Sequence, residues 1–389
     1  MTAPRLTIDL DKIHHNACTL VQRLDDRGIA VTGVTKATLG SPEIANTLIR
    51  AGVRALGDSR IENIESMRSA DVTAAMTLIR SPMLSQAHRV VTGADVSLNT
   101  ELDVIRALSS AAQQTHRTHG VVLMVELGDL REGIMPGDLE SIVGETLRCP
   151  NIVLKGIGTN LACRSGVSPD HNKMAELSAL ADAIDATFGT VLEIVSGGNS
   201  ANLRWALSGA DTGRINELRL GESILLGRET LQRQPIDGLY NDAVTLVAEV
   251  IEAKVKPSLP WGEIAQTAFG AEPPAVDRGP VSQAILAIGR QDVDVDGLDP
   301  PPGIQVVGTS SDHLIVDPGS PALSVGAEVT FQLNYSALVR AMTSPFVTKI
   351  IKGLNEPPRL ASEVGREATG FQPLGADQTT PQNKSRLAS

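Results

Sequence analysis

Strand-like apolar segments alternate with helical patterns through the first 221 residues, and this alternation limits the fold more than any other feature. Each segment carries the β-branched and aliphatic residues of a buried strand. The segments lie at 30–36, 55–58, 75–79, 94–98, 120–125, 153–158, 191–195 and 217–221. Eight strands and their helices within about two hundred residues predict an α/β fold, a closed (β/α)8 barrel of the TIM type. A doubly wound sheet is the alternative, but TKAT (35–38) after the first strand lacks its glycine fingerprint.

The pattern changes near Pro235, where helical patterns give way to strand-like segments separated by glycine and proline. This change predicts a second, all-β domain with few helices. We expect the barrel over residues 1–235, the β domain over 236–353 and a tail over 354–389. The tail is polar and has little apolar surface to bury, so we expect it to be disordered. Residues 1–10 contain a further strand pattern and are left open between the two domains.

A lysine ends the first barrel strand, at the point where the chain turns toward its next helix. Lys36 would therefore lie at the C-terminal mouth of the barrel, where such proteins build their active sites. A partly desolvated amine at this place could form a Schiff base with a carbonyl cofactor. The alternative is a lysine that extends from the strand end into water and has no chemical role.

Charge and composition exclude several classes of protein. The 389 residues carry a formal net charge of −11, which argues against nucleic acid as a partner because phosphate binding needs basic clusters. No apolar run approaches membrane-spanning length, and the N-terminus lacks a hydrophobic signal core. Cys18, Cys149 and Cys163 are scattered and form no CxxC motif. This usage suits the reducing cytoplasm, and we expect no metal site.

Several short motifs sharpen the functional interpretation. They are GDSRIEN (57–63), GDLREG (128–133), GTNLAC (158–163), SGGNS (196–200), RLGE (219–222), KPSLPWGE (256–263) and AMTSP (341–345). Together with the barrel, the lysine and the β domain, they resemble the fold-type III pyridoxal-phosphate (PLP) enzymes of the alanine racemase family, in particular the ornithine racemase branch. The resemblance covers residues 5–351 and leaves out the tail. It implies PLP as the cofactor and Lys36 as the residue that binds it covalently.

The resemblance also implies where the cofactor phosphate binds. It assigns Ser200, which starts a helix beside Asn199, and the backbone of Gly221 and Glu222 to the phosphate. The alternative role of Asn199 or Ser200 is a plain helix cap, and the two roles can coexist. Thr343 and Ser344 lie near the place where alanine racemases carry a phosphate-binding tyrosine, and they are its expected replacements.

Two arginines stand at positions to which the resemblance gives roles. Arg219 would face the pyridine nitrogen and keep it unprotonated, which favours simple return of the proton over decarboxylation. Its alternative is a surface ion pair with Glu217 or Glu222. Arg131 would bind the substrate carboxylate, positioned by Asp129 or Glu132, because Met124 stands where many relatives carry a modified lysine. Asp129 could instead attract the distal ammonium of a diamino acid.

The remaining candidates concern the cofactor ring and a second base. Asn160 would hold the 3′-oxygen of the cofactor or pack on its ring, or else only make a turn. Cys163 is either a buried inert thiol or a second base at the mouth. The resemblance implies that a homodimer shares its active sites, but the matching segment 260–270 has no tyrosine base. Asp312 and His313 are then the expected contribution of the partner subunit, and His313 could equally face solvent.

These assignments predict a cytoplasmic PLP-dependent racemase that interconverts the L- and D-forms of an amino acid, with ornithine or another basic amino acid as substrate. Two alternatives stay open. One is a decarboxylase or D-amino-acid lyase of the same fold, against which Arg219 argues. The other is a non-catalytic PLP-binding protein, against which the β domain argues.

Overall fold

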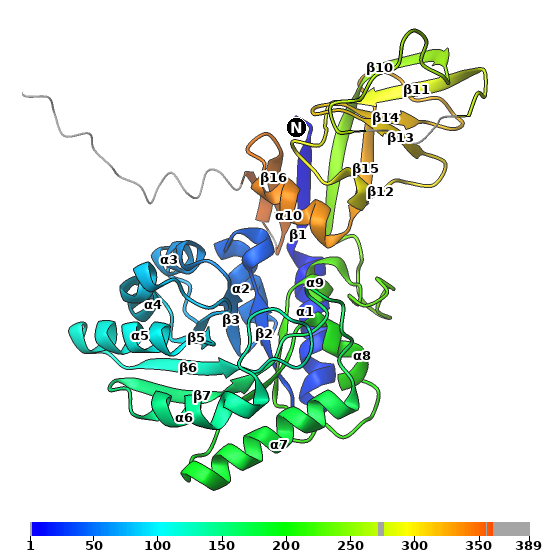
Figure 1. The fold of residues 1–389 in the computed structure, drawn as a ribbon. Coiled ribbons are helices and arrows are strands. Elements are labelled where there is room, and N and C mark those ends of the chain that lie inside the picture. Colours follow the sequence, from blue (N-terminus) through cyan, green and yellow to red (C-terminus); the bar gives the residue numbers. More distant parts are fainter. Residues whose placement is uncertain (1, 271–275, 355, 361–389) are drawn as a thin grey trace, which may run out of the picture.

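The computed structural model describes residues 2–270, 276–354 and 356–360 (Figure 1). Its centre is a closed barrel of parallel strands, which confirms the predicted fold class. The strands are β2 (Ala30–Val34), β3 (Ala55–Asp58), β4 (Met76–Leu78), β5 (Val96–Asn99), β6 (His119–Met124), β7 (Ile152–Gly158), β8 (Ile194–Gly198) and β9 (Glu217–Leu220). The barrel closes where β9 pairs with β2, with Arg219 beside Thr32. Because all eight strands are parallel, their C-terminal ends and the loops that follow them lie at the same mouth of the barrel.

Helices follow the strands around the outside of the barrel (Figure 1). They are α1 (Leu10–Asp25), α2 (Pro42–Arg50), α3 (Ile61–Ser69), α4 (Ala87–Gly93), α5 (Leu102–Gln114), α6 (Leu139–Leu147), α7 (His171–Phe188), α8 (Leu203–Ala206) and α9 (Glu222–Leu226). Short 3-10 turns add η1 (Lys36–Thr38), η2 (Leu84–Gln86), η3 (Pro136–Asp138), η4 (Ser200–Asn202) and η5 (Val295–Gly297). Local signals fix the helix starts, since Asp9, Ser41 and Asp170 accept hydrogen bonds from backbone amides of the first turns they precede.

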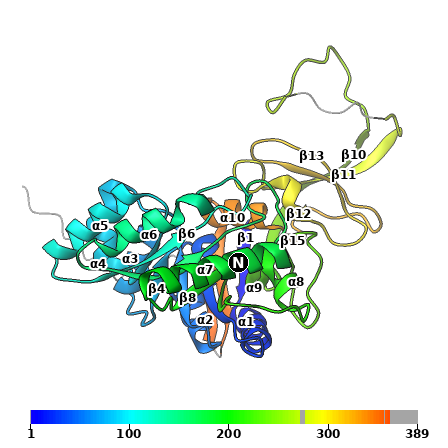
Figure 2. The ribbon, with the colours of Figure 1, turned by 60° about the horizontal axis from the view of Figure 1, so that its bottom comes forward.

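A nine-stranded sheet forms the second unit, and its order along the main path is β13-β14-β11-β10-β1-β16-β17. The strands are β1 (Arg5–Asp9), β10 (Val244–Pro257), β11 (Pro280–Leu286), β12 (Leu298–Asp299), β13 (Gln305–Thr309), β14 (Leu314–Asp317), β15 (Glu328–Leu333), β16 (Thr348–Gly353) and β17 (Glu356–Leu360). The first strand of the chain lies inside this sheet, antiparallel to β10 and parallel to β16. Figure 2 shows that the segment 258–270, which follows β10, extends away from the barrel.

Two features of this region differ from the sequence prediction. A helix, α10 (Tyr335–Thr343), interrupts the strands and packs against η1, directly beside Lys36. Asn334 caps it by accepting a hydrogen bond from the amide of Ala337 at 2.9 Å. The predicted start of the disordered tail, residue 354, is also too early in the sequence. The chain reverses after Gly353, and residues 356–360 form β17, which pairs with β16. Residues 361–389 of the expected tail lie outside the described residues.

Candidate active site

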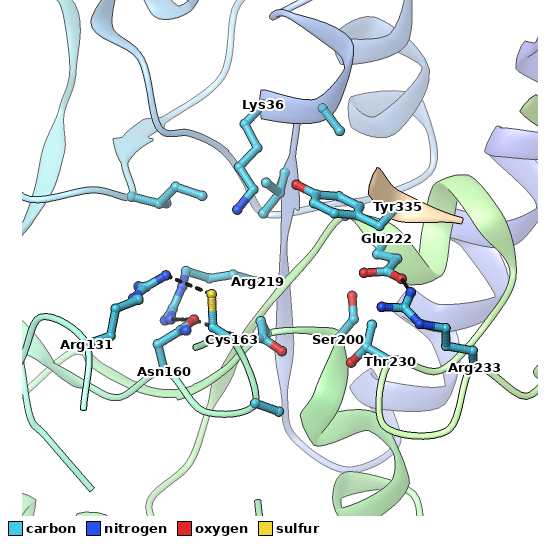
Figure 3. Close-up of a pocket in the computed structure, with 16 residues that line it drawn as sticks. Lys36, Arg131, Asn160, Cys163, Ser200, Arg219, Glu222, Thr230, Arg233 and Tyr335 are labelled. Carbon is cyan, nitrogen blue, oxygen red and sulfur yellow. Dashed lines mark hydrogen bonds and ion pairs between the residues drawn. The ribbon is translucent and has the colours of Figure 1, made fainter. Parts of the chain in front are cut away.

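A pocket opens at the mouth of the barrel, beside the loops that follow the strands (Figure 3). Lys36 enters it from η1, Arg219 from β9, and Tyr335 from α10 of the β domain. The pocket is lined by Val34, Lys36, Ala37, Ile79, Arg131, Asn160, Ala162, Cys163, Asn199, Ser200, Arg219, Gly221, Glu222, Thr230, Arg233 and Tyr335. One cavity thus gathers all the barrel residues that were expected to bind the cofactor or to act in catalysis.

Lys36 points its amine into the pocket, so the solvent-facing alternative is wrong (Figure 3). Its Nζ lies 5.9 Å from the centre of the Tyr335 ring. Burial lowers the pKa of the Lys36 amine, and the guanidinium groups of Arg131 and Arg219 lower it further. Cys163 and Asp58 oppose this shift. The environment therefore favours a neutral amine, which can act as a nucleophile or as a base.

Arg219 is 5 % exposed and has no ion-pair partner within the described residues. Its guanidinium donates to the carbonyl of Thr159 at 2.9 Å, to Oδ1 of Asn160 at 3.4 Å and to the hydroxyl of Ser196. Burial lowers the pKa of Arg219. The expected surface alternative is wrong, because Glu222 pairs with a different arginine and Glu217 accepts the hydroxyl of Thr32.

Arg131 and Cys163 meet at the same end of the pocket. Nη1 of Arg131 donates to the Cys163 sulfur at 3.2 Å, and its Nε lies 2.9 Å from Oε2 of Glu132. Glu132 is thus the carboxylate that positions Arg131. Asp129 is occupied elsewhere, because its oxygens accept backbone amides from the loop at 163–167. It is fully buried, so the idea that it attracts a substrate ammonium is wrong.

Asn160 and Asn199 connect the two walls of the pocket. The amide of Asn199 donates to Oδ1 of Asn160 at 3.2 Å and to the carbonyl of Leu161 at 2.8 Å, while its own oxygen caps η4 through the amide of Ala201. Asn199 is therefore a helix cap as well as a pocket residue. The Nδ2 of Asn160 is buried and has no hydrogen-bond partner within the described part of the chain.

Hydroxyl groups gather at the other end of the pocket. The Ser200 hydroxyl lies 3.0 Å from the hydroxyl of Ser223, which is the second residue of α9. Burial, with the nearby Glu222 carboxylate, raises the pKa of Tyr335. Thr230 places a buried hydroxyl here that has no partner within the described residues. Arg233 completes this end and pairs with Oε1 of Glu222 at 3.0 Å.

Some expected residues lie elsewhere. Asp312 and His313 do not line the pocket but occupy the exposed turn between β13 and β14, where Oδ1 of Asp312 lies 2.8 Å from Nδ1 of His313. Thr343 is exposed, and Ser344 is buried and donates to Asp292 at 2.9 Å. Tyr335 reaches the pocket in their place, so the predicted replacements were wrong. A capped helical pattern after Asn334 was the available signal for Tyr335.

No group of three or more His, Cys, Asp or Glu side chains among the described residues is arranged to hold a metal ion. Within the same part of the chain, no helix is long and apolar enough to cross a membrane. All three cysteines are free thiols.

Comparison with known proteins identifies the family. The family model of the alanine racemase N-terminal domain matches residues 8–229. The chain is 40 % identical to an ornithine racemase of Acetoanaerobium sticklandii over 351 residues, which cover 89 % of this chain and 99 % of that protein. It is 39 % identical to a lysine racemase of Thermotoga maritima over 352 residues, 90 % of this chain and 99 % of that protein. Its fold resembles an alanine racemase structure from Clostridium difficile 630, with a TM-score of 0.70, 19 % identity, and coverage of 92 % of this chain and 98 % of that one. The chain therefore belongs to the alanine racemase family.

Proposed function

We propose that this protein is a cytoplasmic, PLP-dependent racemase of a basic amino acid, with ornithine or lysine as the substrate. The observation that carries the proposal is the pocket itself, in which the Lys36 amine faces the guanidinium groups of Arg131 and Arg219. Identities of 40 % and 39 % to an ornithine and a lysine racemase, over nearly their whole length, support the choice of substrate. The free cysteines fit a reducing compartment.

The donors in the pocket fit PLP. Asn160 Nδ2 and Thr230 Oγ1 are buried without partners in the described residues, and a buried donor needs an acceptor such as a phenolate or phosphate oxygen. Lys36 would hold the cofactor covalently, and Asn160 would donate to its 3′-oxygen. Ser200 and the backbone of Gly221 and Glu222 would bind the phosphate, with Tyr335 as an additional hydroxyl. When bound, PLP supplies an electron sink that acidifies the α-proton of an amino acid.

Arg219 sets how strong that sink is. In each of its three hydrogen bonds within the described residues, the Arg219 guanidinium is the donor. A guanidinium also cannot give up its proton to a pyridine nitrogen. The ring nitrogen beside it would stay unprotonated, which weakens the electron sink and favours return of the proton. This argues for racemisation and against the decarboxylase and lyase alternatives.

Substrate binding and proton transfer fall to residues at the guanidinium end. Arg131 would bind the substrate carboxylate through two parallel hydrogen bonds, held in place by Glu132 and by the Cys163 sulfur. Lys36 would move the α-proton on one side. In Figure 3, Lys36 and Cys163 approach the open centre of the pocket from opposite sides. We assign Cys163 as the second base, which returns the proton on the side opposite Lys36.

The active sites would be shared within a homodimer. Trp261 lies in the long connection after β10 and is 83 % exposed, and Ile264 and Phe269 of the same segment are also exposed. Large apolar side chains gathered on one exposed segment are typical of an interaction surface. The turn with Asp312 and His313 belongs to the same domain and would complete the pocket of the partner subunit.

A direct assay tests the proposal. The purified protein is incubated with L-ornithine, L-lysine and L-alanine, and the products are separated by chiral chromatography. We expect the D-isomer to form fastest from a basic amino acid, and borohydride reduction to fix PLP to the Lys36 peptide. Lys36→Ala is the control and should neither bind PLP covalently nor racemise. Attachment of PLP to Lys155 or Lys173, or the absence of any D-isomer, would overturn the proposal.

A further inference from the structure

The end of the pocket that faces away from Arg131 and Arg219 has an unusual charge pattern. Figure 3 shows Ser200, Thr230, Arg233, Glu222 and Tyr335 together at this end. Three of these side chains bear neutral hydroxyls, one is a guanidinium and one a carboxylate. A carboxylate is an unfavourable neighbour for an anionic ligand. The negative charge of Glu222 must therefore be compensated by a cation before an anionic ligand can bind at this end.

The Thr230 hydroxyl forms no hydrogen bond with any described residue of the chain. Its Oγ1 is buried and has no hydrogen-bond partner among the described residues, whereas the Ser200 hydroxyl is engaged with Ser223. A buried hydroxyl that lacks a partner costs free energy, and such groups are rare unless a ligand satisfies them. Because Thr230 lines the pocket, its unused donor is available to a ligand bound there.

Arg233 is held in place by two independent constraints. Its Nη1 lies 3.0 Å from Oε1 of Glu222, and the Glu222 side chain is only 16 % exposed. The loop that carries Arg233 is also fixed, because the Glu229 carboxylate accepts the backbone amides of Leu231, Gln232 and Gln234 at 2.8 to 3.0 Å. A bridge between Arg228 and Pro235 closes the same loop. The guanidinium is thus presented to the pocket by a preorganised segment.

We infer that Thr230 and Arg233 bind the phosphate group of the cofactor, and that Glu222 is the positioning residue that holds Arg233 beside it. The inference rests on the proposed function, since PLP is what would bring a phosphate here. A phosphate monoester carries close to two negative charges at neutral pH. Arg233 is the only cation among the five side chains at this end, so it both attracts the dianion and shields it from Glu222.

Cofactor binding by the full-length chain, freed of PLP, tests this directly. Each variant is titrated with PLP and with pyridoxal, which keeps the aldehyde for Lys36 but lacks the phosphate. Thr230→Val should weaken PLP binding about tenfold, and Arg233→Gln about ten- to hundredfold, while the affinity for pyridoxal stays unchanged. Inorganic phosphate should compete with PLP in the wild type and markedly less in Arg233→Gln.

A double variant tests the role of Glu222. In Arg233→Gln the carboxylate is left unpaired beside the phosphate, so adding Glu222→Gln should restore part of the lost PLP affinity. Thr343→Val and Arg204→Gln, both at exposed positions outside the pocket, are the matched controls and should bind PLP like the wild type. Melting temperatures of all variants report whether each chain is folded.

The outcomes separate this inference from the proposed function. If the wild type binds no PLP, the proposed function itself fails. If the wild type binds PLP but Thr230→Val and Arg233→Gln bind it equally well, or lose pyridoxal affinity to the same extent, these residues do not contact the phosphate. If the double variant is as weak as Arg233→Gln, the Glu222 carboxylate exerts no charge effect on the phosphate, and the shielding assigned to Arg233 is wrong.

Discussion

Replacing Cys163 should divide the racemase reaction into its two halves. The sulfur lies 3.2 Å from Nη1 of Arg131 and enters the pocket opposite Lys36 (Figure 3). If Cys163 is the base that removes and returns the α-proton on the face of the substrate opposite Lys36, Cys163→Ala stops removal of the α-proton from one enantiomer only. The other enantiomer still meets the Lys36 amine, whose pKa is lowered by burial, and can exchange its α-proton with solvent.

The expected size of the effect follows from the role. A positioned general base contributes about a hundred- to ten-thousandfold, which is about 3 to 5 kcal/mol of transition-state stabilisation. Racemisation by Cys163→Ala should fall by that factor, whereas α-deuteration of one enantiomer in deuterated buffer should stay within about tenfold of the wild type. Mass spectrometry after chiral separation measures both quantities in one experiment.

Two further variants separate proton transfer from positioning. Cys163→Ser keeps a hydrogen-bond acceptor for Arg131, so its KM should stay near that of the wild type while kcat falls, because a hydroxyl gives up its proton far less readily than a thiol. Cys149→Ser, a half-buried position outside the pocket, is the control. Equal loss of exchange for both enantiomers in Cys163→Ala would refute the assignment, and one-sided exchange in His313→Gln instead would move the second base to His313.

Three other predictions follow from the same structure. Arg219→Glu places an acid where the ring nitrogen of the cofactor would lie, so racemisation should fall while long-wavelength absorbance and side transamination rise; an unchanged spectrum would contradict the role of Arg219. A mixture of Lys36→Ala and Asp312→Ala chains, each nearly inactive alone, should regain up to about a quarter of wild-type activity through heterodimers, and no recovery despite heterodimer formation would place both residues in one subunit's site. Burial lowers the pKa of His119 from 6.5 to about 4, so the unfolded chain binds more protons in that window and stability is lost as the pH falls through it. Between pH 7 and pH 5 this should cost about 2 kcal/mol of unfolding free energy in urea titrations, and the cost should vanish in His119→Gln.

The barrel could be predicted because its pattern repeats. Each strand and helix occupies a short, regular length of chain, and burial of one face leaves a periodic apolar signature. Lys36 followed from the same logic, since a residue at the end of a parallel barrel strand must reach the mouth. These inferences need only local sequence and a rule about topology.

Contacts between loops could not be predicted in the same way. Asp129 looked available to a substrate because a carboxylate stood near Arg131 in the sequence, but its oxygens are occupied by amides from a loop more than thirty residues away. The contact of Arg131 with Cys163 likewise joins residues that are 32 positions apart. Only the folded loops decide which polar group is already satisfied and which remains free for a ligand.

Tyr335 shows how a local signal can be outweighed by its surroundings. Asn334 is a good helix cap, and Ala337, Leu338, Ala341 and Met342 are buried on one face of α10. This spacing is helical, but it lies between strand patterns and covers little more than two turns. The expectation of an all-β domain therefore concealed the helix, and with it the tyrosine that closes the pocket.

The position of Tyr335 also bears on what the β domain contributes. The chain passes between the two units twice, from β1 into α1 and from α9 through a loop into β10, so the sheet is fixed to the barrel at both crossings. From this sheet, α10 packs on η1 and sets the Tyr335 ring 5.9 Å from the Lys36 amine. A barrel without the β domain would leave that side of Lys36 open to water and would lose part of the desolvation that lowers its pKa. Under the proposed function, the β domain thus helps to keep the amine of its own chain neutral for proton transfer, which a catalyst requires and a protein that only stores the cofactor does not.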